Sequence, residues 1–278
     1  MSQLKLCIFS DLHYIDKKPE WKINRKLVEY SDPLTDKIIE KVNNEIKPDI
    51  CVNLGDMIQA TKNKERDLEN LKHVWEKLQG FNVPFYTLIG NHELKSVESN
   101  KEIMDVLGYE NATYGVDVNG YHLLFIGTDV NEEDEKYRTQ YISDKDLSWI
   151  AEDLDANSNK KVIVFSHFGI AEDEMKGNFY YDKNPEGGMI INREKLKEIL
   201  HKHKNILSVF CGHQHWTKVI KENGLDYYML GALTENTNWN GIPDGVYFNV
   251  DVNDGVLRVK EEHLKIKLLK EKDWEIEL

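Results

Sequence analysis

The stretch CGHQHWTK (Cys211–Lys218) follows the apolar run NILSVF and places two histidines one residue apart behind a glycine. A short apolar run that ends at polar residues predicts a buried strand, whose carboxyl end here carries His213 and His215. Alternate residues of an extended segment point the same way, so both imidazoles are expected on one side of the chain. Taken alone, the pair is as typical of surface histidines on a loop as of a binding site. The ends of the other strands decide between these interpretations.

Four further apolar runs end in residues of the same kind. CIFSDLHY ends in Asp11 and His13, CVNLGDM in Asp56, YTLIGNHE in Asn91 and His92, and VIVFSH in His167. A glycine precedes three of the five ends, and glycine lets the backbone turn tightly and approach a ligand. In open α/β sheets, binding sites form at the carboxyl ends of the strands, where loops converge. Capping, turn or surface roles explain any one of these residues, but five strand ends in succession indicate a shared site.

Aspartate, histidine and asparagine together form a nitrogen and oxygen ligand set, which suits manganese, iron or zinc. Seven side chains are candidate metal ligands: Asp11, His13, Asp56, Asn91, His167, His213 and His215. Seven ligands are too many for one ion, but they suffice for two ions if one carboxylate bridges them. Asp56 lies in the middle of the series and can bridge through its two oxygens.

The composition indicates a soluble α/β protein with 278 residues and a net charge of -13, and we expect residues 1–278 to form a single domain. The negative charge argues against long nucleic acid or an anionic membrane as a partner. No apolar stretch is long enough for a transmembrane helix, and the N-terminal apolar run is too short for a signal peptide. Three cysteines without C-x-x-C spacing favour free thiols in a reducing compartment, so the cytoplasm is the expected location. The oligomeric state is left open.

Strand-like and helix-like segments alternate along the chain. Strands are predicted over 4–10, 49–54, 83–89, 160–166 and 205–212, and helices over 31–46, 65–78, 143–154 and 192–203. Asn119-Gly120, Asn223-Gly224 and Asn253-Asp254-Gly255 predict hairpin turns. Ser143 is a predicted N-cap with Asp146 as its capping-box partner. We expect an α/β fold with two facing mixed β-sheets and helices outside, in which strands from about residue 216 complete the sheets.

The order D-x-H, G-D-x, G-N-H-E, H and G-H-x-H resembles that of the calcineurin-like metallophosphoesterases, from Leu4 to about Trp216. The resemblance implies a four-layer sandwich and a pair of divalent or mixed-valence manganese, iron or zinc ions. By position, one ion would be held by Asp11, His13, Asp56 and His215, and the other by Asp56, Asn91, His167 and His213. His92 matches the histidine that contacts the substrate phosphate and the leaving group, and it is the candidate catalytic residue. A hydroxide bridging the two ions would attack the phosphorus atom.

The substrate class is less well determined by the sequence. Arg25, Tyr30 and Ser31 form a pattern similar to that of the manganese-dependent ADP-ribose/CDP-alcohol diphosphatase branch, although that branch has glutamine where this chain has His13. The long loop after His167 contains the aromatic residues Phe179, Tyr180 and Tyr181, which would either stack on a nucleobase or pack under the loop. Arg25, Tyr180 and Tyr181 are therefore candidate substrate-binding residues.

We expect a phosphodiesterase or nucleotide diphosphatase that acts on a small nucleotide-type substrate, near the diphosphatase branch or the cyclic-nucleotide phosphodiesterases. The alternative is a phosphomonoesterase acting on a small metabolite or a phosphoprotein. A non-catalytic scaffold with the same fold is a third possibility, and the intact ligand set argues against it.

Overall fold

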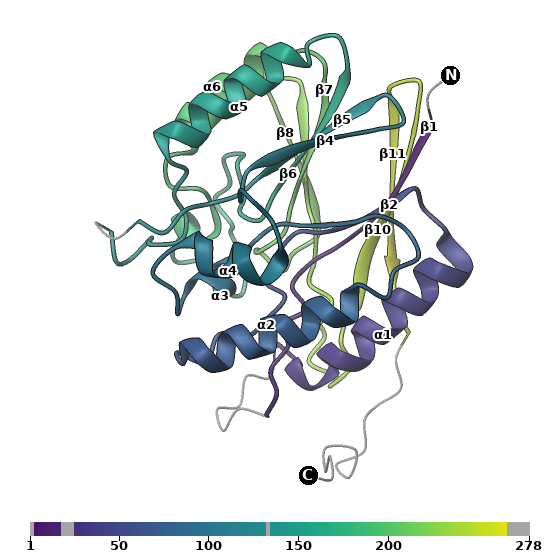
Figure 1. The fold of residues 1–278 in the computed structure, drawn as a ribbon, viewed down its shortest axis with the longest axis vertical. Coiled ribbons are helices and arrows are strands. Elements are labelled where there is room, and N and C mark those ends of the chain that lie inside the picture. Colours follow the sequence, from purple (N-terminus) through teal and green to yellow (C-terminus); the bar gives the residue numbers. More distant parts are fainter. Residues whose placement is uncertain (1–2, 18–24, 132–133, 266–278) are drawn as a thin grey trace.

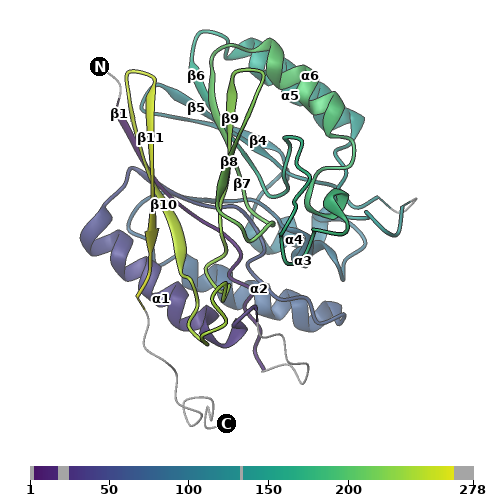
Figure 2. The same ribbon diagram turned by 180° about the vertical axis from the view of Figure 1, so that it is seen from behind.

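The computed structural model describes residues 3–17, 25–131 and 134–265. Two mixed β-sheets face each other, and helices cover the outer face of each sheet (Figure 1). The predicted α/β architecture, with two facing sheets and helices outside, is confirmed. The same arrangement seen from behind shows the hairpin of β10 and β11 beside β1 (Figure 2).

The first sheet has five strands in the order β11-β10-β1-β2-β3. Their bounds are Gln3–Phe9 for β1, Ile50–Asn53 for β2, Phe85–Thr87 for β3, Val246–Asn253 for β10 and Val256–His263 for β11. The strands β1, β2 and β3 are parallel, and β10 is antiparallel to β1. Four helices lie on the side of the first sheet (Figure 1): α1 (Ser31–Lys41), α2 (Lys64–Leu78), α3 (Asn91–Leu94) and α4 (Asn100–Leu107). A short 3₁₀ turn (Val28–Tyr30) precedes α1, and a π-helical turn (Val42–Ile46) follows it.

The second sheet has six strands in the order β4-β5-β6-β7-β9-β8. Their bounds are Tyr114–Val118 for β4, Tyr121–Ile126 for β5, Lys161–Ser166 for β6, Ile206–Cys211 for β7, Lys218–Glu222 for β8 and Leu225–Met229 for β9. The four central strands are parallel, and the edge strands β4 and β8 are antiparallel to their neighbours. The helices α5 (Asp144–Ala156) and α6 (Arg193–Lys202) pack on this sheet, and a 3₁₀ turn (Pro185–Gly188) precedes α6.

Three apolar layers hold the sandwich together. Ile8, Phe125 and Phe210 belong to the layer between the two sheets, which is fully buried. The other two layers fill the spaces between each sheet and its helices. Because both faces of each parallel strand are covered, the strands read as continuous apolar runs. This burial fixes the strands, so their carboxyl ends present the loops at defined positions.

The predicted hairpin turns are confirmed. Asn119, Asn223 and Asp254 adopt positive φ angles of 51°, 50° and 47°, and the glycine after each is also positive. Two successive residues with positive φ are the signature of a type I′ turn, which matches the twist of the flanking strands. The resulting pairs are β4 with β5, β8 with β9, and β10 with β11.

The N-cap of α5 is confirmed, but its capping box is not formed. The Ser143 hydroxyl oxygen accepts a hydrogen bond from the Asp146 N–H at 3.1 Å. The Asp146 carboxylate, however, accepts from the Ser143 hydroxyl group, at 3.0 Å. The Ser143 N–H donates instead to the carboxylate of Asp129, at 3.1 Å. The predicted hydrogen bond from the Ser143 N–H to the Asp146 carboxylate is wrong, because Asp129 accepts from this N–H instead.

A buried histidine links the β4–β5 hairpin to α5. His122 on β5 lies with Nδ1 2.9 Å from Asp117 and with Nε2 2.8 Å from Asp153. Burial acts to lower the pKa of His122, but its hydrogen bonds with Asp153 and Asp117 raise it above the ordinary value. The imidazole is therefore favoured as a cation between two carboxylates in the folded protein.

The cysteines and the helices can be compared with the expectations from the sequence. Cys7, Cys51 and Cys211 are buried and carry free thiols. Across the described residues, no helix combines the length and the apolar character needed to cross a membrane.

Candidate metal centre and active site

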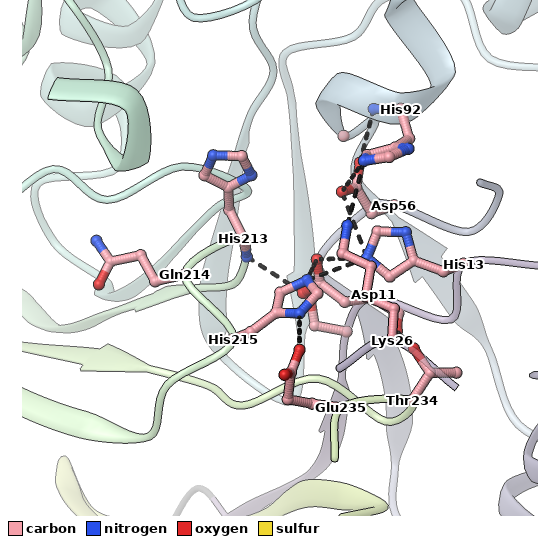
Figure 3. Close-up of polar contacts among 12 residues, drawn as sticks. Asp11, His13, Lys26, Asp56, His92, His213, Gln214, His215, Thr234 and Glu235 are labelled. Carbon is pink, nitrogen blue, oxygen red and sulfur yellow. Dashed lines mark hydrogen bonds and ion pairs between the residues drawn. The ribbon is translucent and has the colours of Figure 1, made fainter. Parts of the chain in front are cut away.

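The carboxyl ends of the parallel strands from both sheets meet at one place (Figure 3). Asp11 follows β1, Asp56 follows β2, Asn91 follows β3, His167 follows β6 and His213 follows β7. All seven candidate metal ligands are buried. The structure brings them together in two adjacent groups with Asp56 at their boundary.

The first group contains Asp11, His13 and His215, whose ligand atoms lie within 4.8 Å of one another. Nε2 of His215 lies 3.0 Å from Oδ1 of Asp11 and 3.0 Å from Nε2 of His13. Asp56 borders this group, because its Oδ2 atom lies 3.8 Å from Nε2 of His13.

The second group contains Asp56, His167 and His213. Nε2 of His167 lies 3.4 Å from Oδ1 of Asp56. The Asn91 side chain completes this group, because its amide end lies 3.2 Å from His167 Nε2, 3.2 Å from Asp56 Oδ2 and 2.9 Å from His213 Nδ1. Asp56 thus lies between the two groups, with Oδ2 near both His13 and Asn91 and Oδ1 near His167, which is the position that a bridging carboxylate needs.

Hydrogen bonds on the outer side of three imidazoles fix which ring nitrogen faces the centre. Nδ1 of His167 lies 2.8 Å from the Leu54 carbonyl oxygen, and Nε2 of His213 lies 3.0 Å from the Gly187 carbonyl oxygen. Nδ1 of His215 lies 2.5 Å from the Glu235 carboxylate. Each outer partner accepts a hydrogen bond from the ring N–H, so the opposite nitrogen of a neutral ring has its lone pair toward the centre. This is the arrangement found in metal-binding histidines.

The inward-facing atoms fit cations. Nε2 of His13 and Nε2 of His215 are only 3.0 Å apart, and two imidazole lone pairs at this distance need a proton or a cation between them. The Asn91 carbonyl oxygen faces only acceptor atoms, which a cation would also satisfy. The donors are imidazole nitrogens, carboxylates and one amide oxygen, a set that binds transition metals. The residues present therefore fit two metal ions that share Asp56.

The backbone at the centre is held in an uncommon conformation. Five of the seven ligands have positive φ angles between 50° and 63°: Asp11, His13, Asp56, His213 and His215. Residues other than glycine in this region cost about 1–3 kcal/mol each, and they cluster at functional sites. The surrounding loops leave no room for adjustment. A Cβ atom at Gly90 would overlap the Asp56 carboxylate, and one at Gly212 would overlap the Ser10 hydroxyl group.

The charges of the centre stabilise one another. Burial acts to raise the pKa of Asp56, but the charge and the hydrogen bond of the neighbouring His167 hold it well below its ordinary value. Burial likewise opposes ionisation of Asp11, while His215 keeps its pKa low. Both carboxyl groups are therefore ionised and available to cations.

His92 lies beside the centre with its ring fixed by the backbone. Its Nδ1 atom accepts a hydrogen bond from the Ala60 N–H at 3.1 Å, and its Nε2 atom lies 3.9 Å from Asp56 Oδ2. Burial lowers the pKa of His92 well below its ordinary value, and Lys95 and Lys26 lower it further. The ring is therefore neutral and carries its single proton on Nε2, where it faces the centre.

Glu235 joins the metal ligands to the candidate substrate residues. Its side chain is 1% exposed and accepts hydrogen bonds from His215 at 2.5 Å and from the Tyr180 hydroxyl group at 3.0 Å. It also forms an ion pair with Arg25, whose Nε atom lies 2.5 Å from Oε1. Sequence reasoning did not find this role, because Glu235 lies in no predicted strand or helix and in no motif.

The predicted substrate residues lie on one side of the centre. Arg25 and Tyr180 contact Glu235, as described above, and the Tyr181 hydroxyl group lies 2.9 Å from His213 Nε2. Both tyrosines are thus engaged with groups that contact metal ligands. Phe179 and Trp239 remain 57% and 54% exposed, and their ring centres lie 5.0 and 5.4 Å from the Arg25 guanidinium carbon.

These aromatic residues line a pocket of 590 Å³ that reaches His215. Its walls include Arg25, Phe179, Tyr180, Trp216 and Trp239. Trp239 was not predicted from the sequence. It comes from a segment more than 200 residues after Arg25, and the two are neighbours because residues 25–27 pair with residues 234–236 through backbone hydrogen bonds.

The fold and the metal-ligand groups define a metal-dependent phosphoesterase. The profile of the calcineurin-like phosphoesterase family matches residues 4–217, and the chain belongs to this family.

The similar proteins act on several phosphate esters. A "probable glycerophosphodiester phosphodiesterase" from Arcobacter nitrofigilis is 26% identical over 76% of this chain and 74% of its own length. A "manganese-dependent ADP-ribose/CDP-alcohol diphosphatase" from Arabidopsis thaliana is 23% identical over 79% of this chain and 80% of its own length. A solved structure of a dimetal phosphatase from Danio rerio superimposes with a TM-score of 0.73 at 16% identity, covering 94% of this chain and 96% of the other. The chain is thus a hydrolase of the phosphoesterase family.

Proposed function

We propose that the protein hydrolyses a small nucleotide-type substrate, as a phosphodiesterase or nucleotide diphosphatase that uses two metal ions. The observation that carries this proposal is the pocket beside His215, where exposed aromatic rings and a guanidinium group adjoin the metal ligands. The names of the similar proteins, which include both phosphodiesterases and a diphosphatase, support the same reaction class.

The pocket has the chemistry of a nucleobase site. Phe179 and Trp239 are more than half exposed, and the Arg25 guanidinium group lies over both rings. Aromatic rings and guanidinium planes both stack on bases, and each stacked base contributes about 1–3 kcal/mol. Because His215 lines the same pocket, a nucleotide bound there would place its phosphate near the metal ligands.

The metal ions would be held by the two groups that share Asp56, and manganese, iron or zinc suits the donor set. When bound, such ions supply positive charge that activates water and neutralises phosphoryl oxygens.

The chain's own residues perform the remaining tasks. The Nε2–H of His92 faces the centre and can donate a hydrogen bond to a phosphoryl oxygen as charge develops in the transition state. The Ala60 N–H donates to Nδ1 of His92, so this nitrogen carries no proton. The ring therefore acts through its Nε2–H as a hydrogen-bond donor and not as a general acid. Glu235 orients His215 and Arg25 together, which aligns the metal centre with the nucleobase pocket.

The test is a set of rate measurements on protein loaded with manganese, iron or zinc. The substrates are bis-p-nitrophenyl phosphate, p-nitrophenyl phosphate, cyclic nucleotides, ADP-ribose and CDP-alcohols. We expect nucleotide diesters or diphosphates to give the highest kcat/KM, and Trp239→Ala to raise KM for them without affecting bis-p-nitrophenyl phosphate. A preference for p-nitrophenyl phosphate would favour a phosphomonoesterase. Absence of hydrolysis with every metal would contradict the proposal.

A further inference from the structure

Two lysines and His92 converge on one point beside the metal centre. Nζ of Lys95 lies 3.0 Å from Nε2 of His92, and Nζ of Lys26 lies 3.3 Å from the same atom. Lys95 follows α3, whereas Lys26 lies in the segment before α1, so two separate loops deliver the ammonium groups. Figure 3 shows Lys26 and His92 directed toward the same space next to Asp56.

All of the nitrogen atoms at this point are donors. Because the Ala60 N–H donates to Nδ1 of His92, the proton of the neutral ring is on Nε2, which cannot accept from either lysine. When the Asn91 carbonyl oxygen faces the metal ligands, its amide nitrogen lies 3.0 Å from Nζ of Lys95 and adds a further donor. Four donor groups thus face one another, and Oδ2 of Asp56 lies 3.9 Å from His92 Nε2, beyond hydrogen-bonding distance.

No carboxylate among the described residues lies within ion-pairing distance of these lysines, although Asp56 attracts both of them from farther away. Within residues 3–17, 25–131 and 134–265, neither Lys26 nor Lys95 has an ion-pair partner within 4.0 Å. Two ammonium groups held this close repel each other unless an anion lies between them. The position of Lys26 is fixed by its backbone, since residues 25–27 pair with residues 234–236. The arrangement is therefore built for an anion that the protein itself does not provide.

We propose that Lys26 and Lys95 bind a second phosphate of the substrate, the one that leaves, and that the protein therefore cleaves diphosphate linkages in preference to simple phosphodiesters. This inference rests on the proposed function, because it assigns the leaving group of the same reaction. The nucleobase pocket lies on the His215 side of the centre and the lysines on the His92 side. A dinucleotide-like diphosphate spans both sides, with one phosphate at the metal ligands and the other at the lysines.

The chemistry of the linkage agrees with this assignment. Water adds to one phosphorus atom, the bond from that phosphorus to the bridging oxygen breaks, and its electron pair stays on the departing phosphate. The protons of the water end on the product phosphates or in solvent. A phosphate leaves without being protonated, so it needs cationic donors and no general acid. Two ammonium groups supply such donors, whereas an alcohol leaving group would need a proton that His92 is not arranged to give.

The experiment compares two substrates that share the attacked phosphoryl group and differ in the leaving group. In thymidine diphosphate glucose the leaving group is glucose 1-phosphate. In the p-nitrophenyl ester of thymidine monophosphate it is p-nitrophenolate. In the manganese-loaded enzyme, Lys26→Met and Lys95→Met should each lower kcat/KM for the diphosphate by about 10- to 100-fold, the range for a lost charge-assisted hydrogen bond. The ester should change by less than about threefold, because its leaving group carries no phosphate for the lysines to bind.

A second measurement reports binding without turnover of the diphosphate. Glucose 1-phosphate, the departing product, should inhibit hydrolysis of the ester, and its inhibition constant should rise in both variants by a factor similar to the loss in kcat/KM. Lys26→Arg and Lys95→Arg keep the charge and should recover part of the activity. The control is Lys72→Met, which removes an exposed lysine of α2 that pairs with Glu76. It should change none of these values.

The outcomes separate this inference from the proposed function. Equal losses on both substrates at equal manganese content would mean that the lysines hold the attacked phosphoryl group, and unchanged rates would mean that they do not touch the substrate. Either result overturns the inference while the phosphoesterase activity stands. A wild-type enzyme that hydrolyses neither substrate with two metal ions bound would overturn both.

Discussion

Glu235→Gln tests whether one buried carboxylate couples the metal centre to the pocket. Glutamine has nearly the same volume and keeps one acceptor oxygen, but it loses the charge. Glu235 accepts hydrogen bonds from His215 at 2.5 Å and from Tyr180 at 3.0 Å, and it forms an ion pair with Arg25 at 2.5 Å. Arg25 is itself only 9% exposed. The substitution leaves the Arg25 charge buried without its partner and turns an amide NH₂ toward one of the donors.

The expected losses follow from these contacts. Breaking a buried ion pair by removing one partner costs about 3–5 kcal/mol, so the unfolding free energy of the metal-free protein should fall by that amount. Because His215 loses the carboxylate that orients its ring, manganese should bind about 10- to 100-fold more weakly. Urea unfolding measures the first effect, and calorimetric titration with manganese measures the second.

Glu172→Gln is the matched control. Glu172 pairs with Arg193 and Lys197 at 2.7 and 3.0 Å, outside the metal centre. Its side chain is 53% exposed, so the control should lose less stability and should bind manganese as the wild type does. Manganese affinity of Glu235→Gln within about threefold of the wild-type value would refute the idea that this carboxylate positions His215.

Three further outcomes are expected. Asp56→Ala should abolish both metal binding and hydrolysis, because it removes the ligand shared by both groups; elemental analysis that still finds two ions per chain would contradict this. His92→Ala should keep the metal content and lower the rate by about 10²- to 10³-fold for good and poor leaving groups alike, since the ring donates a hydrogen bond; a much larger loss for alcohol leaving groups would make it a general acid, and loss of metal would make it a ligand. The raised pKa of His122 means that its stabilising contribution is complete below about pH 6.5 and is lost as the pH rises through the folded-state value. The difference in unfolding free energy between the wild type and His122→Gln should therefore shrink as the pH rises above about 6.5, and a constant difference would exclude this titration.

The sequence was informative where function is tied to strand ends. Asp11, Asp56 and His167 each end an apolar run, so their convergence follows from the rule that carboxyl ends of parallel strands share one edge. Helices and hairpins were predictable for the same local reasons, which are periodicity and asparagine-glycine turns. The helix α4 was not predicted, because its two turns bury only Ile103, Met104 and Leu107.

The sequence was silent where function depends on contacts between distant loops. Glu235 has no motif, and its importance comes from the pairing of residues 25–27 with residues 234–236. Lys26 and Lys95 are two of many lysines, and only the backbone positions around His92 distinguish them. Phe179, Tyr180 and Tyr181 are adjacent in one loop. A loop has no periodic pattern that would show which side chain is buried and which faces solvent.

The pairing of β1 with β10 has a consequence for how the protein is made. Leu4 pairs with Val252, so the first strand has a partner on one side only until residues 246–253 have been synthesised. The bond between Asp11 and His215 likewise joins residues 204 positions apart. Such distant pairings slow folding, and an unpaired strand edge invites association with other chains while it waits. We therefore expect a nascent chain stalled before β10 to be aggregation-prone and dependent on chaperones, whereas the β5-α5-β6 unit has all its neighbours close by and can form early on the ribosome.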